Sequence, residues 1–396
     1  MSAARATAGR PKICFVVSSP MTAEAFLTDH VRALAERYDV TLVANADPEA
    51  IVHPDLRRAT RVSAPIARKI SLFADAAALV RLFGILRRGG FSAVHSLTPK
   101  AGLLTAIAAC AARVPVRIHT FTGQVWATRT GASRAMLKAL DRLIARLDTH
   151  VLADSASQLD FLKAERVLGD GAGAVIGKGS VSGVDRQRFR PDETARTKVR
   201  LELRIPQEAI VFLFVGRLTR DKGVLDLARA FGKAAAARGD VYLAFVGPDE
   251  HALSAEILAA ASPHARRIRF TGYSAEPERY MAAADVFCLP SYREGFGSVV
   301  IEAAAAGLPA IGSHIYGIVD AIEDGTTGLL VEPRDADALC AAMLRLAGDP
   351  IMRGDFAHAA RERALADFPK EALTAALLDF YARALSPTAS RAELAT

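Results

Sequence analysis

The stretch ADVFCLPSYREGFGSVVIEAAAAG, residues 284–307, reads as a strand, a glycine turn and a helix. The apolar run ADVFCLPS ends at Pro-Ser, which is typical of a buried strand. The turn Gly295-Phe296-Gly297 follows, and an alanine-rich helix begins at Ser298. Because the first N–H groups of a helix lack internal partners, this junction predicts a site for anions.

Two carboxylates flank this turn. Glu294 precedes it, and Glu302 lies about one helical turn beyond it on an otherwise apolar face. Glu302 could simply be a carboxylate that is stabilised by its place near the helix N-terminus. However, a carboxylate on an apolar face is costly unless something hydrogen-bonds it, which favours a ligand with hydroxyls and phosphates. In one helix the two would lie about 12 Å apart. Glycosidase carboxyls lie within about 5–10 Å of each other, so the spacing counts against a hydrolase pair.

Strand-like and helical runs alternate along almost the whole chain, which predicts parallel sheets covered on both faces. The glycine-rich stretch 169–193 interrupts the pattern, and a second series follows it. We therefore expect an α/β protein with domains at 11–186 and 187–368, both doubly wound, and a C-terminal helix at 369–388 that packs on the first domain. Two such domains would hold a ligand at the carboxyl ends of their strands.

Composition agrees with a globular protein of two domains: 396 residues, 51% hydrophobic and 23% charged. Its four cysteines lie singly in apolar runs, which predicts reduced core thiols and a cytoplasmic location; they are Cys14, Cys110, Cys288 and Cys340. The longest apolar stretch, residues 101–112, is too short to span a bilayer and predicts a buried helix.

Charge is unevenly distributed. Residues 1–186 contain 25 Lys and Arg against 15 Asp and Glu, a net charge of +10, whereas the whole chain carries +7. This asymmetry indicates that the N-terminal half meets an anionic partner, either a membrane surface or a phosphorylated substrate. Nucleic acid is not expected, because aromatics are few and no long Lys/Arg run occurs.

A second candidate anion site follows the strand IVFLFVG, where GRLTRDKG contains Arg217 and Lys222. An Arg fork and a mobile Lys charge suit a diphosphate.

Other known motifs are missing. No G-x-G-x-x-G follows the first strand, Gly177-Lys178 lacks the other P-loop residues, and no metal-ligand spacing is present. No cofactor or metal is expected.

Polar side chains near the ends of first-domain strands are candidates for the same ligand cleft. His119 ends VRIHT, and His95 and Lys100 lie in HSLTPKAG. Arg129 follows shortly after the single tryptophan, Trp126, which could be a packing residue or a platform for an acceptor.

These motifs together resemble glycosyltransferase family 4, the retaining nucleotide-sugar enzymes that include bacterial capsule, O-antigen and lipid-linked oligosaccharide transferases. The resemblance covers nearly the whole chain and is strongest in residues 216–223, 270–313 and 325–333. It implies the GT-B fold, two Rossmann-like domains facing across a central cleft. It also implies a hexosyltransferase that acts without a metal, with retention of configuration.

The resemblance implies a role for each matching residue. Glu302 would bind the ribose hydroxyls, and Arg217 and Lys222 the diphosphate. Glu294 and His119 would act beside the transferred sugar. The remaining donor contacts would come from the amides of Phe296, Gly297 and Ser298 and from the backbone around Tyr273. His95, Lys100 and Arg129 would lie on the acceptor side.

Within the family, SLTPKAGLL and RIHTFTGQVW resemble enzymes that extend sugars on polyprenyl-diphosphate carriers. The expected donor is UDP-linked, and the expected location is cytoplasmic, peripheral at the inner membrane face.

One departure from the family pattern concerns the loop after the first strand, Ser18–Phe26, which has no glycine where many relatives have a glycine-rich loop. The alternative is a non-hydrolysing sugar-nucleotide epimerase, which would need no acceptor; a catalytically silent scaffold is a third reading.

Overall fold

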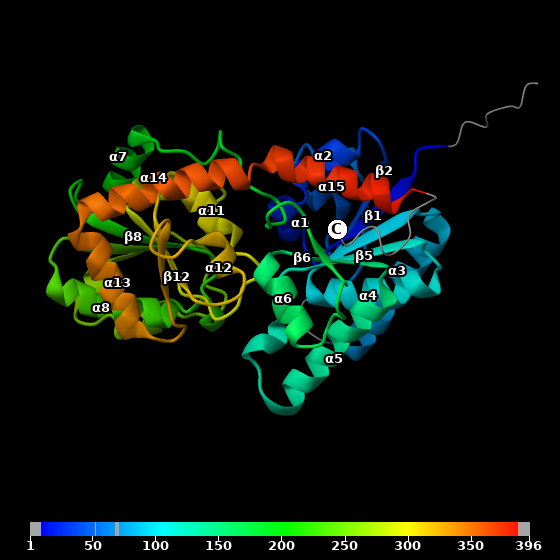
Figure 1. The fold of residues 1–396 in the computed structure, drawn as a ribbon, viewed down its shortest axis with the longest axis horizontal. Coiled ribbons are helices and arrows are strands. Elements are labelled where there is room, and N and C mark those ends of the chain that lie inside the picture. Colours follow the sequence, from blue (N-terminus) through cyan, green and yellow to red (C-terminus); the bar gives the residue numbers. More distant parts are fainter. Residues whose placement is uncertain (1–8, 52, 68–70, 387–396) are drawn as a thin grey trace, which may run out of the picture. The chain divides into compact units, whose positions relative to one another are not determined.

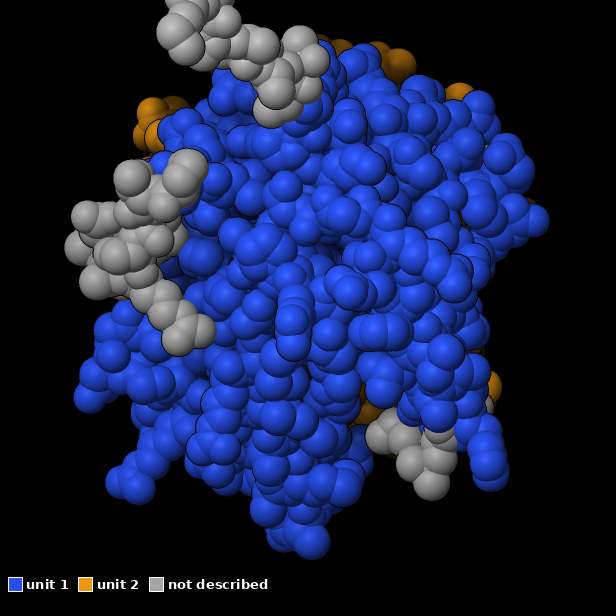
Figure 2. Space-filling view, turned by 90° about the vertical axis from the view of Figure 1, so that its right-hand side faces the viewer, with its two compact units in different colours: residues 1–154, 158–177, 371–396 blue, residues 155–157, 178–370 orange. Residues whose placement is uncertain are grey.

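Two parallel sheets organise the computed structural model, which describes residues 9–51, 53–67 and 71–386 (Figure 1). The described residues fall into two units, coloured separately in Figure 2. Unit 1 holds residues up to 154, residues 158–177 and those from 371 onward, and unit 2 holds residues 155–157 and 178–370. Residues 387 and 388, the end of the expected C-terminal helix, lie outside the described residues.

The seven-stranded sheet of unit 1 has the order β3-β2-β1-β4-β5-β6-β7. Its strands are β1 (Lys12–Val16), β2 (Asp39–Ala44), β3 (Thr60–Ser63), β4 (Ala93–Leu97), β5 (Val116–Phe121), β6 (His150–Ala153) and β7 (Ala174–Val175). The order reverses direction between β1 and β4, as in a doubly wound fold. Strands β3 and β7 escape the sequence pattern because both are short and only partly buried.

Helices cover both faces of this sheet. They are α1 (Pro20–Phe26), α2 (Thr28–Leu34), α3 (Leu72–Gly89), α4 (Pro99–Ala111), α5 (Gly131–Leu147), α6 (Ala156–Ala164) and α15 (Lys370–Ala384). Helices α3, α4 and α5 lie on one face, with α4 packed against both neighbours, while α2 and α15 lie on the other (Figure 1). The apolar stretch 101–112 lies in α4 up to Ala111 and is mostly buried, as predicted.

The glycine-free loop after β1 becomes helix α1. The Ser19 side chain accepts a hydrogen bond from the Thr22 amide and so caps the helix, with Pro20 in its first turn. This segment therefore satisfies part of its own N-terminus, which a glycine-rich loop would leave open.

Helix α15 is tied to unit 1 by buried histidines. The Tyr381 hydroxyl lies 2.8 Å from His95 Nδ1, and the Thr374 hydroxyl lies 3.1 Å from His30 Nδ1. Burial lowers the pKa of His95 to about 3, with smaller contributions from His119 and His30, so its ring stays neutral at ordinary pH. Both His95 nitrogens are occupied, because Nε2 lies 2.7 Å from the Thr120 hydroxyl.

We expect Tyr381→Phe to lower the free energy of unfolding by about 1–3 kcal/mol, because it removes the partner of a buried imidazole nitrogen. Urea unfolding followed by the fluorescence of Trp126, the single tryptophan, measures this in unit 1. Tyr273→Phe is the control, since that side chain is 63% exposed. Equal stability of Tyr381→Phe and the control would contradict the role of this hydrogen bond.

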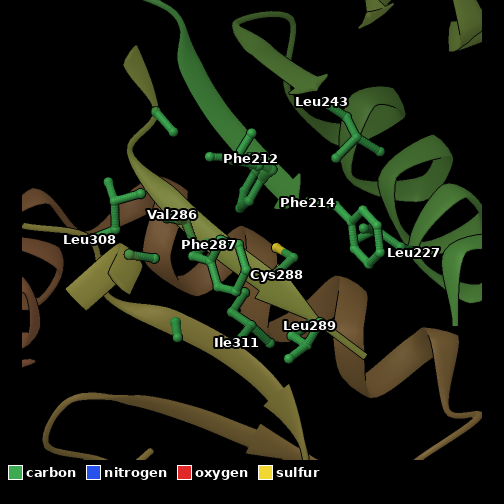
Figure 3. Packing of buried hydrophobic residues seen from close by; sticks show 14 of the residues in the cluster. Phe212, Phe214, Leu227, Leu243, Val286, Phe287, Cys288, Leu289, Leu308 and Ile311 are labelled. Atoms are coloured by element: carbon green, nitrogen blue, oxygen red, sulfur yellow. The ribbon is translucent and has the colours of Figure 1, made fainter. Parts of the chain in front are cut away.

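The six-stranded sheet of unit 2 has the order β10-β9-β8-β11-β12-β13. Its strands are β8 (Ile210–Val215), β9 (Val241–Val246), β10 (Ile268–Phe270), β11 (Val286–Leu289), β12 (Ala310–Ser313) and β13 (Gly328–Val331). All six lie within apolar runs of the second series. Phe212, Phe287 and Ile311 pack in the core between this sheet and its helices (Figure 3).

Eight helices among the described residues flank this sheet. They are α7 (Glu193–Glu202), α8 (Val224–Ala237), α9 (Ser254–Ala260), α10 (Pro277–Ala283), α11 (Ser298–Ala305), α12 (Ile318–Ala321), α13 (Ala336–Gly348) and α14 (Pro350–Asp367). Helices α8 and α13 pack together, as do α11 and α14. The strand, turn and helix predicted for residues 284–307 are β11, the loop after it and α11.

All four cysteines are free thiols. Cys14, Cys288 and Cys340 are buried as predicted, but Cys110 is exposed near the end of α4, so its prediction as a core thiol was wrong. None of the helices in the described part of the chain combines the length and apolarity needed to span a bilayer.

Candidate functional site

The candidate donor residues gather at the point where the strand order of unit 2 reverses. Strands β8 and β11 are neighbours there, although three α-helices and two strands separate them in sequence. Arg217 and Lys222 follow β8, and Glu294 to Ser298 follow β11. Loops at the carboxyl ends of such neighbouring strands form the usual ligand site of open α/β sheets.

Close backbone packing joins the two loops. Gly223 has a φ of 68°, and a Cβ on it would overlap the carbonyl group of Pro290. The Tyr292 amide donates to the carbonyl of Asp221 over 2.8 Å. Arg293 adds an ion pair of 3.1 Å with the Asp221 carboxylate. These contacts fix the turn that contains Lys222 against the segment that contains Glu294.

Lys222 and Glu294 form an ion pair across the two loops, and both side chains are largely buried, with exposed fractions of 23% and 13%. Arg217 is more exposed and pairs with Glu250 over 2.9 Å. Each cation therefore has a carboxylate partner, which a bound anion would share or replace.

The N-terminus of α11 is open. Gly297 precedes the helix with a φ of 86°, and no side chain caps the helix end. Phe296 is fully buried and its ring packs on Phe368 with centroids 5.2 Å apart, so only its backbone is available to a ligand. The hydroxyl of Ser298 lies 3.0 Å from that of Ser180. The amides at this helix start are therefore suited to an anion.

Ser180 escaped the sequence analysis. It has a φ of 69° in the stretch Gly177–Gly183, and its hydroxyl also accepts from the Gly183 amide. The glycines around it predict a domain junction, and Gly177-Lys178 lacks the other P-loop residues, so the pattern contains no signal for Ser180. A second missed position is Gly317, where a Cβ would lie 2.7 Å from the carbonyl oxygen of Gly295 and so press on the loop after β11.

Glu302 lies in α11, half-buried, and no described residue hydrogen-bonds its carboxylate. Burial raises its pKa from 4.5 to about 7; Arg188 lowers this pKa and Glu278 raises it. Those two residues pair with each other over 2.9 Å. A carboxylate that is desolvated but has no partner is an expected feature of a ligand contact.

Tyr273 lies on the loop after β10, with its side chain 63% exposed. The carbonyl of the preceding residue, Gly272, accepts from the Gly247 amide over 2.8 Å. A Cβ on Gly247 would overlap the carbonyl of Gly216. The loops after β8, β9 and β10 therefore approach one another at the backbone, on the side of β8 away from β11.

In unit 1 the histidines do not stand at strand ends, so that part of the prediction was wrong. His95 is the third of five residues in β4, and His119 the fourth of six in β5. His119 Nδ1 lies 2.9 Å from the Ser96 hydroxyl, and its ring covers Gly102 so closely that a Cβ there would lie 2.7 Å from Nδ1. Burial lowers the pKa of His119 to about 3.

The contact of His119 with a sugar stays a prediction. Its Nε2 atom is buried and no described residue bonds it. His95, by contrast, has both nitrogens bonded inside the unit, and such a side chain positions α15. It would have to lose one of these bonds to reach an acceptor.

Lys100, Arg129 and Trp126 lie in different surroundings. Lys100, in the first turn of α4, forms an ion pair of 2.5 Å with Asp75. Arg129 follows a short 3₁₀ helix and is exposed. Trp126 is buried, stacks on Phe161 and donates to Asp141 over 2.7 Å, so it is a packing residue.

Both units match models of known domain families. Residues 195–363 match "Glycosyl transferases group 1", and residues 22–177 match "Glycosyl transferase 4-like domain". The chain is a group 1 glycosyltransferase. The two matches lie in unit 2 and unit 1 respectively, apart from residues 155–157.

Curated relatives extend over most of the chain. The capsular polysaccharide biosynthesis glycosyltransferase CapM of Staphylococcus aureus is 27% identical over 80% of this chain and 83% of its own. The UDP-Gal:alpha-D-GlcNAc-diphosphoundecaprenol alpha-1,3-galactosyltransferase of Escherichia coli is 27% identical over 80% of this chain and 82% of its own. This group 1 glycosyltransferase is therefore a hexosyltransferase, and the epimerase and scaffold alternatives are not retained.

The fold also agrees with solved structures. HepE of Anabaena in complex with UDP-glucose superposes with a TM-score of 0.78, at 20% identity, over 94% of this chain and 99% of that one. The group 1 glycosyltransferase thus has the two-domain α/β architecture called GT-B.

Proposed function

We propose that this glycosyltransferase moves a sugar from a UDP-linked donor to a hydroxyl of a saccharide on a polyprenyl diphosphate. The observation that supports it best is the grouping of Lys222, Glu294 and the uncapped start of α11 where the sheet order reverses. A UDP-glucose complex of HepE supports the donor, and the printed name of the Escherichia coli relative supports the lipid-linked acceptor.

In this proposal the cations and the helix start stabilise the departing diphosphate. Negative charge develops on the diphosphate as the bond to the anomeric carbon breaks, and fixed positive groups lower the energy of that state. Arg217, Lys222 and the amides from Phe296 to Ser298 supply this charge, so the reaction needs no metal ion. The acceptor hydroxyl attacks the anomeric carbon from the face that the diphosphate leaves and gives its proton to the departing phosphate oxygen, so configuration is retained.

The other side chains orient the donor and the acceptor. Glu302 accepts hydrogen bonds from the ribose hydroxyls, and the backbone around Tyr273 holds the base. Glu294 contacts the sugar, and His119 approaches it as a neutral imidazole. His95, Lys100 and Arg129 remain candidates for the acceptor side, and of these Arg129 needs the smallest rearrangement. A lipid-linked acceptor places the enzyme at the inner face of a membrane, as a peripheral protein.

Glu302→Gln tests the ribose contact. We expect this variant to raise the Kd for UDP about tenfold or more, because a neutral amide accepts more weakly than a carboxylate. Calorimetric titration measures the Kd. Glu202→Gln is the matched control, as its carboxylate pairs with Arg279, and it should leave the Kd almost unchanged. Equal Kd values for wild type and Glu302→Gln would contradict the assignment.

The raised pKa of Glu302 predicts a pH dependence with opposite signs for binding and stability. Without ligand, a folded pKa near 7 against 4.5 unfolded means that this group destabilises the fold as pH rises between those values. UDP binding requires the ionised carboxylate, so affinity should fall as pH drops below about 7. Glu302→Gln should therefore melt higher than wild type above pH 7 and lose part of the pH dependence of the Kd.

A further inference from the structure

One face of α3 is apolar and exposed to solvent. Phe73 is 92% exposed, Val80 72% and Phe83 40%. Phe73 and Val80 are seven residues apart, close to two helical turns, and Phe83 follows three residues later, so the three lie along one side of the helix. With the exposed Ala76 between them they form the α3 stripe: Phe73, Ala76, Val80 and Phe83.

The fold of unit 1 does not use this stripe. The opposite side of α3 supplies Ala78, Leu82 and Leu86 to the core, where they pack with residues of the sheet and α4. Helix α4 lies beside α3 on the same face of the sheet (Figure 1). An exposed row of large apolar side chains, with the core already filled, indicates a surface that another molecule covers.

Unpaired positive charge continues the α3 stripe toward the end of the helix. Arg87 lies seven residues beyond Val80 on the same side, and Arg88 follows; both are exposed, and no described residue pairs with either side chain. The single carboxylate of α3, Asp75, forms an ion pair with Lys100. The surface of α3 therefore presents apolar and cationic groups with no competing free carboxylate.

We propose that the α3 stripe seats unit 1 on an anionic lipid bilayer, with Phe73, Val80 and Phe83 entering the interface and Arg87 and Arg88 contacting lipid phosphates. A helix with an apolar face and basic ends binds at the boundary of headgroups and acyl chains in this way. A second copy of the chain fits less well, because its α3 would offer Arg87 and Arg88 no carboxylate other than Asp75, which already pairs with Lys100. The inference rests on the proposed function only in that a lipid-linked acceptor lies in a membrane.

The test is flotation of the full chain with two kinds of vesicle, one of phosphatidylcholine and one of equal parts phosphatidylcholine and phosphatidylglycerol. We expect the protein to float with the anionic vesicles only. The double variant Phe73→Ser/Val80→Ser should bind the anionic vesicles at least about tenfold more weakly, because two large apolar groups no longer enter the interface. Arg87→Gln/Arg88→Gln should weaken binding and reduce its sensitivity to salt.

A matched control is Leu201→Ser/Ile351→Ser, which alters two apolar side chains of unit 2 that are 68% and 75% exposed. This variant should float like wild type. The melting-temperature shift caused by UDP should be the same in all these proteins, which shows that the variants are folded and separates this inference from the donor site. Three results would overturn the proposal. Wild type could fail to float, or the α3 and control variants could float equally. The third result is a smaller oligomer that appears only in Phe73→Ser/Val80→Ser.

Discussion

Lys222→Ala is expected to lower the rate of sugar transfer about 10²–10³-fold, the usual loss when one fixed donor to a developing negative charge is removed. Lys222 is held near the helix start of α11 by Gly223, whose backbone packs on Pro290. Water can fill the space left by the ammonium group, but it cannot supply a fixed charge. The fold should persist, because Lys222 is partly exposed and lies in a short turn.

The matched control for this variant is Arg220→Ala. Arg220 lies in the same turn, is 59% exposed and pairs with Glu256 over 2.8 Å. Its replacement should change the rate less than about threefold, since an exposed ion pair contributes little. Initial rates at saturating donor and acceptor, with melting temperatures for both variants, measure the difference. If the Lys222→Ala enzyme were as fast as Arg220→Ala, the assignment of Lys222 to the diphosphate site would be wrong.

Asp285→Ala is expected to destabilise unit 2 by about 3–5 kcal/mol, because it leaves a buried guanidinium without its countercharge. Asp285 directly precedes β11 and binds both Arg196 and Arg200 over 2.7 Å. It also accepts from the Val211 amide of β8 over 2.7 Å. Arg200 is fully buried, and its remaining bonds are to backbone carbonyls. Loss of Asp285 therefore affects α7, β8 and β11 together.

Asp337→Ala provides the comparison for Asp285→Ala. Asp337 pairs with Lys233 on the surface, where both side chains are more than half exposed. Solvent screens such a pair, so we expect only a small change in melting temperature. Thermal unfolding followed by circular dichroism measures both variants. Similar melting temperatures for Asp285→Ala and Asp337→Ala would show that the buried network contributes no more than a surface pair.

Much of unit 2 could be predicted from sequence because its strands are continuous apolar runs. The glycine turn at residues 295–297 before a helix also predicts a site for anions. Lys222 could be assigned to the site because it lies, with Arg217, in the segment between a strand and the next helix. Its pairing with Glu294 could not, since that contact depends on β8 and β11 being neighbours in the sheet. Residue spacing contains no information about strand order.

The errors in unit 1 have a common physical cause. The sequence predicts His95 and His119 near strand ends, yet each lies inside the sheet, where a hydroxyl partner accommodates it. Ser96 and Thr120, which supply these hydroxyls, lie on neighbouring strands. A pattern based on apolar runs cannot detect such paired polar residues, which are satisfied only in three dimensions.

The central claim is transfer of a sugar from UDP to a lipid-linked saccharide, and mass spectrometry of the acceptor tests it most directly. The enzyme would be incubated with a panel of UDP-sugars and a polyprenyl-diphosphate-linked saccharide. We predict that one donor increases the acceptor mass by a single sugar residue, with release of an equal amount of UDP, and that Lys222→Ala forms almost none of this product. An unchanged acceptor mass with every donor, in enzyme whose melting temperature UDP does not raise, would contradict the account.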